Sequence, residues 1–234
     1  MNPPLSLQDR MKEVSNRIEA ACARSGRNRN EVRIIAVTKY VSVEATQEVL
    51  DQGLLHIGEN RAQNALPKIK ALGDTAVWHY IGHLQSNKVK DVVGKFSYIH
   101  SVDRLSLAKE INKKAAALGV QMNVFVQVNV SGEESKQGVE PNEAKSLLVE
   151  INKLSHLKVV GLMTMAPIVD KPEQVRPVFR GLRLLRDELN REHVTDEPIA
   201  ELSMGMSDDF EIAIEEGATW IRLGTILVGK GETM

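Results

Sequence analysis

The sequence predicts a (β/α)8 barrel, the TIM-barrel fold of the α/β class, preceded by one extra helix. Short apolar runs alternate eight times with amphipathic helical segments along the 234 residues. This strict alternation implies parallel strands joined by right-handed crossovers. Eight such units in ~250 residues make a closed barrel. An open, doubly wound sheet would give the same alternation and is the alternative.

The extra helix begins at Ser6, a suitable N-cap, and ends at Gly26, with apolar residues at three- and four-residue steps between them. Each strand is a short apolar run rich in Val, Ile or Leu, as expected for strands buried on both faces. The expected strands cover residues 33–39, 54–57, 77–81, 96–99, 124–130, 157–162, 200–202 and 219–223. The helices expected between them cover 42–53, 61–72, 85–94, 103–119, 141–154, 173–191 and 207–216.

Composition excludes several functional classes. Thirty basic residues against 31 acidic ones give a net charge of −1, which offers no electrostatic basis for binding nucleic acid or an anionic membrane. No apolar run approaches the ~20 residues that a membrane helix needs, and we expect no signal peptide before Arg10. The single cysteine, Cys22, fits a reducing compartment. We therefore expect a cytoplasmic protein, and a monomer because no long apolar edge is exposed in a barrel.

In a barrel, functional residues lie in the loops after the carboxyl ends of the strands. Lys39 ends the first apolar run, Arg33 to Lys39, and could form a Schiff base if its surroundings lower its pKa. The alternative is an ordinary surface lysine at a strand terminus. Taken alone, the local sequence favours the surface lysine.

The loop 203–207, with Ser203 and Gly205, follows the seventh strand and precedes a helix, and Gly224 and Thr225 follow the eighth. Loops after strands seven and eight commonly bind phosphate in barrels, through backbone N–H groups and a helix N-terminus. The alternative is that Ser207 only caps the following helix.

Arg222 lies within the eighth strand and needs a partner, because arginine is rarely buried alone. The partner could be a carboxylate, a phosphate or a ring nitrogen.

Two other patterns are rejected. Residues 224–231 resemble a P-loop but lack its Ser/Thr and a following helix, and the six histidines show no zinc-ligand spacing, so we expect no metal site.

Six motifs together resemble the pyridoxal-phosphate (PLP) homeostasis family, which is similar to the N-terminal barrel of alanine racemase, the fold type III arrangement of PLP proteins. They are AVTK at 36–39, IGEN at 57–60, WHYIGHLQSNK at 78–88, GLMTM at 161–165, LSMGMSDD at 202–209 and IRLGT at 221–225. They span nearly the whole chain, and each is weak alone. One departure is His83, where relatives often carry a small residue or proline.

The resemblance implies that residues 1–234 form one PLP-binding barrel domain. It implies that Lys39 holds PLP covalently as an internal aldimine (a Schiff base) and that Arg222 faces the pyridine nitrogen. Asn60 would lie near the ring. The implied phosphate contacts are Ser203, the backbone near Gly205, Gly224 and Thr225.

The functional expectation is cofactor buffering or delivery in vitamin B6 homeostasis, without turnover, with apo PLP-dependent enzymes as possible recipients. A protonated Arg222 that donates to the pyridine nitrogen would keep that nitrogen unprotonated, which weakens PLP as an electron sink. The first alternative is a fold type III amino-acid racemase, which needs a second acid/base opposite Lys39. We expect no second domain after Met234 to supply it. A barrel lyase using an imine on Lys39 is the other alternative, although such lysines usually lie on a middle strand.

Overall fold

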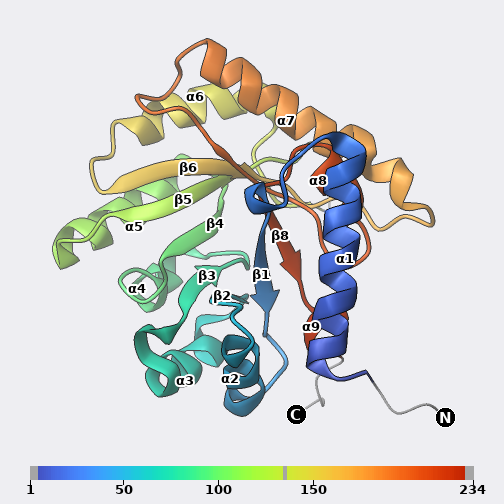
Figure 1. Ribbon diagram of the computed structural model, residues 1–234. Coiled ribbons are helices and arrows are strands. Elements are labelled where there is room, and N and C mark those ends of the chain that lie inside the picture. Colours follow the sequence, from blue (N-terminus) through green and yellow to red (C-terminus); the bar gives the residue numbers. More distant parts are fainter. Residues whose placement is uncertain (1–4, 134–135, 230–234) are drawn as a thin grey trace.

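The computed structural model, which describes residues 5–133 and 136–229, contains eight parallel strands closed into a barrel (Figure 1). The strands follow one another around the barrel in chain order, and β8 pairs with β1 to close it. The predicted (β/α)8 barrel is therefore confirmed, and the open sheet is excluded.

The strands are β1 (Arg33–Val37), β2 (His56–Glu59), β3 (Val77–Tyr80), β4 (Tyr98–Val102), β5 (Met122–Gln127), β6 (Leu157–Met163), β7 (Glu201–Ser203) and β8 (Trp220–Leu223). The α-helices are α1 (Leu7–Ser25), α2 (Val43–Asp51), α3 (Ala62–Leu72), α4 (Val89–Val92), α5 (Leu105–Leu118), α6 (Pro141–Asn152), α7 (Arg176–Arg191), α8 (Phe210–Glu215) and α9 (Thr225–Val228). Four short 3-10 helices cover Arg29–Glu31, Gly73–Thr75, Ser86–Lys88 and Pro172–Val175.

Two strands start later than their apolar runs suggest. Strand β2 covers His56–Glu59 rather than 54–57, because its pairing with β3 begins at His56, opposite Val77, and continues to Glu59. Strand β4 runs from Tyr98 to Val102 rather than over 96–99, and its pairing with β5 shifts register between Ile99 and Val102. Glu59 therefore belongs to a strand and not to the loop in which it was expected.

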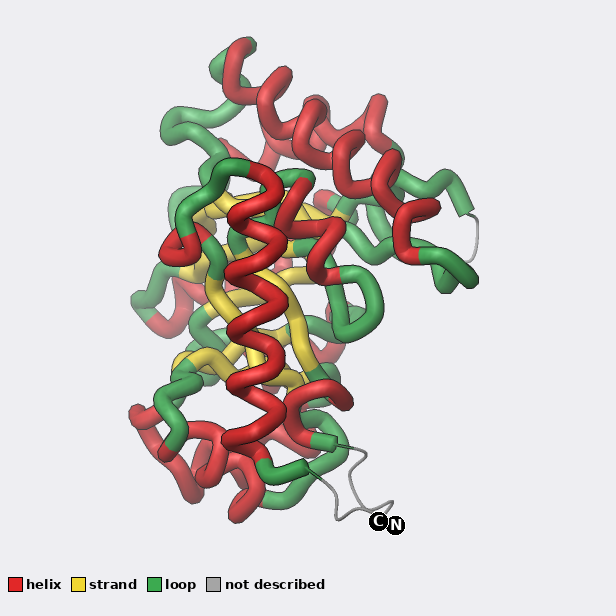
Figure 2. Tube along the Cα trace, turned by 45° about the vertical axis from the view of Figure 1, so that its right-hand side comes forward, coloured by secondary structure: helices red, strands yellow, loops and turns green. Residues whose placement is uncertain are grey.

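Helix α1 lies lengthwise along the outside of the barrel, next to α8 and α9 (Figures 1 and 2). The Ser6 hydroxyl caps it by accepting from the Asp9 N–H at 3.1 Å, and Gly26 ends it in the left-handed conformation with φ 66°. Salt bridges Arg17–Glu211 and Arg24–Glu215, at 2.8 and 2.6 Å, join it to α8. The N-terminal helix therefore braces the loops after β7 and β8.

The apolar core has two parts. The larger part lies between the strands and the helices. The smaller part fills the barrel itself and consists of Ile35, Phe125, Met163 and Trp220. Gly161 makes room for it, because a Cβ at that position would lie 2.5 Å from the Phe125 ring. The barrel is thus a packed core rather than a pore.

None of the helices over residues 5–133 and 136–229 has the length and apolar character needed to cross a membrane.

Candidate cofactor site

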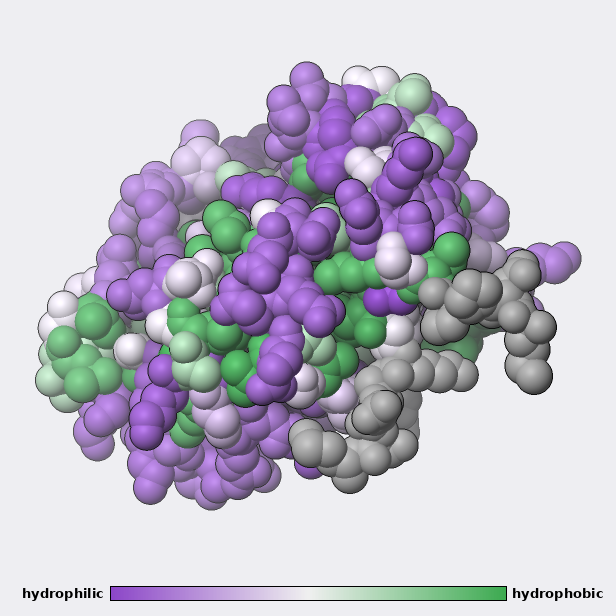
Figure 3. Space-filling model, turned by 60° about the horizontal axis from the view of Figure 1, so that its bottom comes forward, coloured by the Kyte–Doolittle hydropathy of each residue, from purple (hydrophilic) through white to green (hydrophobic). Residues whose placement is uncertain are grey.

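A cavity of about 480 Å³ lies at the carboxyl ends of the strands. It opens on the face towards which β1 and β8 run, where hydrophobic side chains gather between hydrophilic ones (Figure 3). Its lining includes five of the predicted site residues, which come from the ends of three strands, β1, β2 and β8: Lys39, Asn60, Arg222, Gly224 and Thr225. The remaining lining residues are Val37, Ile81, Gly82, His83, Gln127, Gln137, Met165, Met206, Ser207 and Asp208.

Lys39 lies two residues beyond the end of β1 and is partly exposed to the cavity. Its ammonium lies 4.9 Å from the centre of the Tyr40 ring. The residue before it, Thr38, is fully buried and points out of the barrel, where its hydroxyl donates to Glu59 Oε1 at 2.6 Å. Because Thr38 is held on one side of the chain, Lys39 is directed to the other, into the cavity.

A buried ion pair behind the strands fixes this geometry. Lys68 of α3 donates to Glu59 Oε1 at 2.7 Å and to the carbonyl oxygen of Thr38 at 2.6 Å. The second carboxylate oxygen of Glu59 is buried and has no hydrogen-bond partner among the described residues. Sequence patterns do not predict this pair, because Glu59 follows the second apolar run and Lys68 lies in the middle of an amphipathic helix.

Arg222 lies inside the barrel, 5% exposed, at the floor of the cavity. Its Nη1 donates to Ser203 Oγ at 2.7 Å and its Nη2 donates to the carbonyl oxygen of Thr164 at 3.0 Å. No carboxylate of the described residues lies within 4.0 Å of it, although Asp209 is close enough to raise its pKa in part. Burial lowers the pKa of Arg222 to about 10, so the guanidinium stays charged at neutral pH.

Ser203 and Gly205 lie outside the cavity lining. Ser203 is fully buried, with its hydroxyl against Arg222 and His100. Gly205 has φ 92°, its carbonyl oxygen accepts from the Arg222 N–H at 3.0 Å, and a Cβ there would lie 2.5 Å from Cβ of Ala213. Both residues therefore contact the strand that carries Arg222, from below the cavity.

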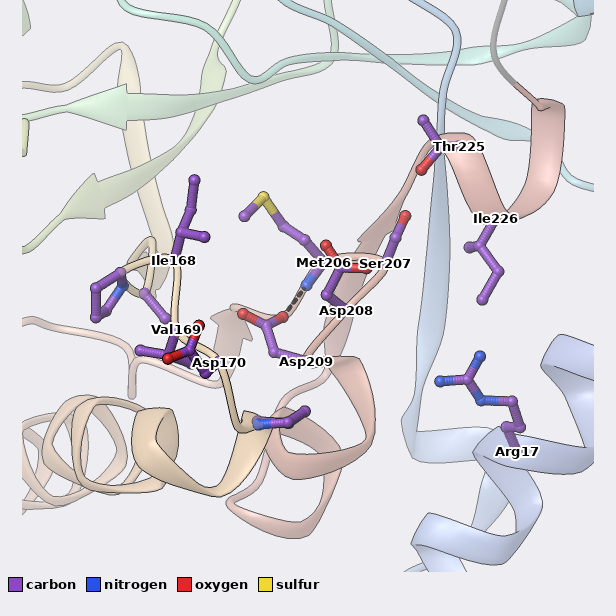
Figure 4. A pocket seen from close by; sticks show the side chains of 13 residues that line it. Arg17, Ile168, Val169, Asp170, Met206, Ser207, Asp208, Asp209, Thr225 and Ile226 are labelled. Atoms are coloured by element: carbon purple, nitrogen blue, oxygen red, sulfur yellow. Dashed lines mark hydrogen bonds between the residues drawn. The ribbon is translucent and has the colours of Figure 1, made fainter.

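Two hydroxyl-bearing residues line the cavity at the loops after β7 and β8, Ser207 and Thr225. Helix α8 begins at Phe210 with Asp209 as its N-cap, so Ser207 does not cap it. The Asp209 carboxylate instead accepts from the Met206 N–H, as the dashed line in Figure 4 marks. Ser207 belongs to the predicted loop 203–207, but the sequence analysis considered it only as a helix cap, and it is Ser207 rather than Ser203 that lines the cavity.

Ser207 and Thr225 also border a second hollow of about 600 Å³ on the outer side of these loops. Arg17 of α1, Ile168, Asp170 and Ile226 face it (Figure 4). The two loops thus form a thin wall between the cavity and the outer surface.

Comparisons with known proteins place the chain in one family. The family model described as "Alanine racemase, N-terminal domain" matches residues 11–231. A pyridoxal phosphate homeostasis protein of Aquifex aeolicus is 49% identical over 223 residues, which cover 95% of this chain and 97% of that protein. PipY of Synechococcus elongatus, solved with PLP bound, is 34% identical with a TM-score of 0.80, over 92% of this chain and 100% of that chain. An alanine racemase of Clostridium difficile shares the fold alone, at 19% identity and a TM-score of 0.73, over 94% of this chain and 56% of that one.

Proposed function

Since this chain belongs to the family of pyridoxal phosphate homeostasis proteins, within the alanine racemase N-terminal domain family, we propose that it binds PLP and serves in the cell's PLP homeostasis. The observation that carries the proposal is the meeting of Lys39, Arg222 and two hydroxyl-bearing loops around one cavity at the carboxyl end of the barrel.

The lining fits the chemical groups of PLP. Lys39 supplies a primary amine that can bond to an aldehyde. Ser207, Thr225 and the loop backbones after β7 and β8 offer hydrogen-bond donors of the kind that hold a phosphate. Arg222 donates from Nη1 and Nη2 to neutral acceptors, and it faces the cavity as a cation with no carboxylate of the described residues within 4.0 Å. Asn60 adds a side-chain amide to the lining of the cavity, where it would lie near the pyridine ring of PLP.

Arg222 favours holding the cofactor over turnover. PLP, when bound, supplies an electron sink for carbanions, and the sink is strongest when the ring nitrogen is protonated. A guanidinium can only donate hydrogen bonds, so a ring nitrogen placed opposite Arg222 would accept one and would stay unprotonated. A site of this kind suits buffering or delivery of the cofactor.

Delivery would take the cofactor to apo forms of PLP-dependent enzymes in the cytoplasm. Three large apolar side chains are exposed in the loops around the mouth, Tyr40, Met165 and Ile168, the last of them 97% exposed. They could meet a recipient enzyme. Mixing the loaded protein with an apo enzyme, and comparing its reactivation rate with that given by free PLP, tests direct transfer. Equal rates would mean that the protein only buffers free PLP.

The decisive experiment on binding uses Lys39→Ala. The wild-type protein incubated with PLP should absorb in the visible range, and borohydride reduction should attach the cofactor to the peptide that contains Lys39, read by mass spectrometry. Lys39→Ala should lose both signals while keeping its melting temperature, and Lys90→Ala, an exposed lysine of α4, should keep both. Unmodified wild-type protein after reduction would refute the proposal.

Deuterium exchange at Cα of L-alanine and other amino acids separates a carrier from a racemase. The ionisable side chains that line the cavity, within the described residues, are Lys39, His83, Asp208 and Arg222. We expect no exchange. Deuterium exchange that depends on Lys39 would mean that the protein is an enzyme and not a carrier.

A further inference from the structure

Three histidines form a continuous hydrogen-bonded chain through the interior of the barrel, below the candidate cofactor site. His56 Nδ1 lies 3.0 Å from His79 Nε2, and His79 Nδ1 lies 2.9 Å from His100 Nε2. His100 Nδ1 lies 3.0 Å from Ser203 Oγ, which in turn accepts from Arg222 Nη1 at 2.7 Å. The chain crosses from the first residue of β2 to Arg222 on β8.

The chain is rigidly packed. His79 and His100 have no exposed surface. The His79 ring stacks on Tyr98, with centroids 4.5 Å apart and planes 3° from parallel, and the His100 ring stacks on Phe125 at 4.1 Å and 15°. His56, at the outer end, is half-buried and meets the Trp220 ring edge-on at 4.7 Å. The imidazoles therefore cannot turn to find other partners.

The chain is also uncharged at neutral pH. Burial holds the pKa values of His79 and His100 well below the usual value, and each neighbouring ring and the nearest arginine add to this. Burial, followed by Arg33, lowers the pKa of His56. Arg33 lies at that outer end, over the Trp220 ring and paired with Glu201, and Arg222 lies at the inner end. Protonation of any of the three imidazoles would therefore place a positive charge between Arg33 and Arg222.

Neutral rings and one serine allow only two arrangements of the protons. A neutral imidazole has one N–H donor and one acceptor, so each ring sets the tautomer of the next. In one arrangement Ser203 donates to His100 Nδ1, and His79 and His100 both carry their proton on Nε2. In the other, all protons lie on Nδ1, and Ser203 receives two donors, from His100 and Arg222. Its own hydrogen then has no acceptor among the described residues, in a site without exposed surface.

We propose that His56, His79 and His100 are positioning residues for Arg222: as a neutral chain with every proton on Nε2, they turn the Ser203 hydroxyl so that its lone pairs face the guanidinium. Arg222 is thereby held by neutral acceptors alone, and its charge remains available to the cavity. The part of this proposal that concerns the cofactor rests on the proposed PLP binding. The tautomer and its dependence on Ser203 do not.

The first test therefore uses the protein without cofactor. Nitrogen-15 NMR of ring-labelled histidine reports which nitrogen of each neutral imidazole carries the proton, and His79→Phe and His100→Phe assign the signals. We expect Nε2–H for both rings at pH 7. A proton on Nδ1, or a charged ring, at either position would overturn the proposal.

The second test asks whether the serine sets the chain. Ser203→Ala removes the hydroxyl that is the partner of His100 Nδ1 among the described residues. We therefore expect the Nδ1–H tautomer to become populated at His100 and, through it, at His79. Ser101→Ala is the matched control, because Ser101 is a buried serine next to His100 in the chain whose hydroxyl has no hydrogen-bond partner among the described residues. Unchanged tautomers in Ser203→Ala, with its fold intact by circular dichroism, would contradict the proposal.

The third test reads the cofactor. Ser203→Ala should bind PLP about tenfold more weakly and with a shifted absorption maximum, since a hydrogen bond to a charged group is lost, and Ser101→Ala should match the wild type. Wild-type protein that fails to bind PLP would refute the proposed function and leave the NMR result standing. PLP bound alike by both variants would refute the link between the histidine chain and the cofactor.

Discussion

Arg222 carries most of the chemical argument at the scale of single residues. It is a buried cation whose hydrogen bonds go to a hydroxyl and a carbonyl oxygen, and no carboxylate among the described residues pairs with it. Burying an unpaired charge is costly, so such a residue is normally retained for a ligand or a charge partner. Its place at the floor of the cavity points to the ligand.

Replacing Arg222 by methionine keeps the length of the side chain and removes the charge. We expect PLP affinity to fall about tenfold, because a charged hydrogen bond to the ring is lost. Stability should change little, since the desolvation cost of the guanidinium disappears together with its two hydrogen bonds. Titration with PLP followed by absorbance, together with thermal melting, measures both effects.

Arg33→Met is the control, because Arg33 is also a barrel arginine but lies at the opposite end, paired with Glu201. It should leave PLP affinity unchanged. Equal affinities for wild type and Arg222→Met would show that the guanidinium does not contact the cofactor.

At the scale of elements, the packing of β2 on α3 decides where Lys39 points. The Glu59–Lys68 pair lies in the buried layer between β2 and α3. Both of its side chains form hydrogen bonds with Thr38, the residue before Lys39. Both side chains of the pair are buried, and Glu59 Oε2 has no hydrogen-bond partner among the described residues, so the two charges depend on each other.

We predict that Lys68→Met destabilises the protein by about 3 kcal/mol, because it leaves the Glu59 carboxylate buried without its counter-ion. Urea denaturation measures the loss. Lys70→Met, an exposed lysine two residues further along α3, should change the free energy of unfolding by less than about 0.5 kcal/mol. The double variant Glu59→Gln/Lys68→Met should be more stable than Lys68→Met alone. A Lys68→Met protein as stable as the wild type would mean that water already solvates Glu59.

Much of this architecture could be predicted from the sequence, and the reasons are physical. The apolar runs predict the alternation of strands and helices. Because the carboxyl ends of the strands share one face of a barrel, the sequence also predicts that Lys39, Arg222 and Thr225 lie close together, as they do around the cavity. The histidine chain could not be foreseen. Its members lie 23 and 21 residues apart on three strands, and they meet only because each points inward at a matching height.

The positions of Ser203 and Ser207 could not be predicted either, because they depend on which side chains of β7 point into the barrel. Both follow the seventh apolar run, and sequence alone cannot say that Ser203 still belongs to β7 and points into the barrel, below the cavity. The strand's last inward position falls on Ser203, and the hydroxyl that lines the cavity is four residues later. The register of β7 therefore decides which of the two serines lines the cavity.

For the whole molecule, the consequence of a polar chain inside the barrel is a stability that depends on pH. The pKa values of His56, His79 and His100 are lowered in the folded protein, in each case chiefly by burial. In the unfolded chain they are about 6.5. Below that pH the unfolded state binds more protons than the folded state, so stability falls as pH falls.

The free energy of unfolding should therefore be nearly constant from pH 8 to 7 and then decrease below about pH 6.5, by up to about 1.4 kcal/mol per pH unit for each buried histidine. The carboxylates with lowered pKa values, such as Glu173 and Glu216, start from a usual value of 4.5 and add to the loss only at lower pH. Urea titrations at pH 8, 7, 6 and 5.5 give the slope. His79→Phe, which keeps a ring on Tyr98, should reduce it by about one histidine's share. A slope that is the same in this variant, or a stability that rises towards pH 5.5, would show that the interior imidazoles take up protons freely in the folded barrel and that the chain is open to water.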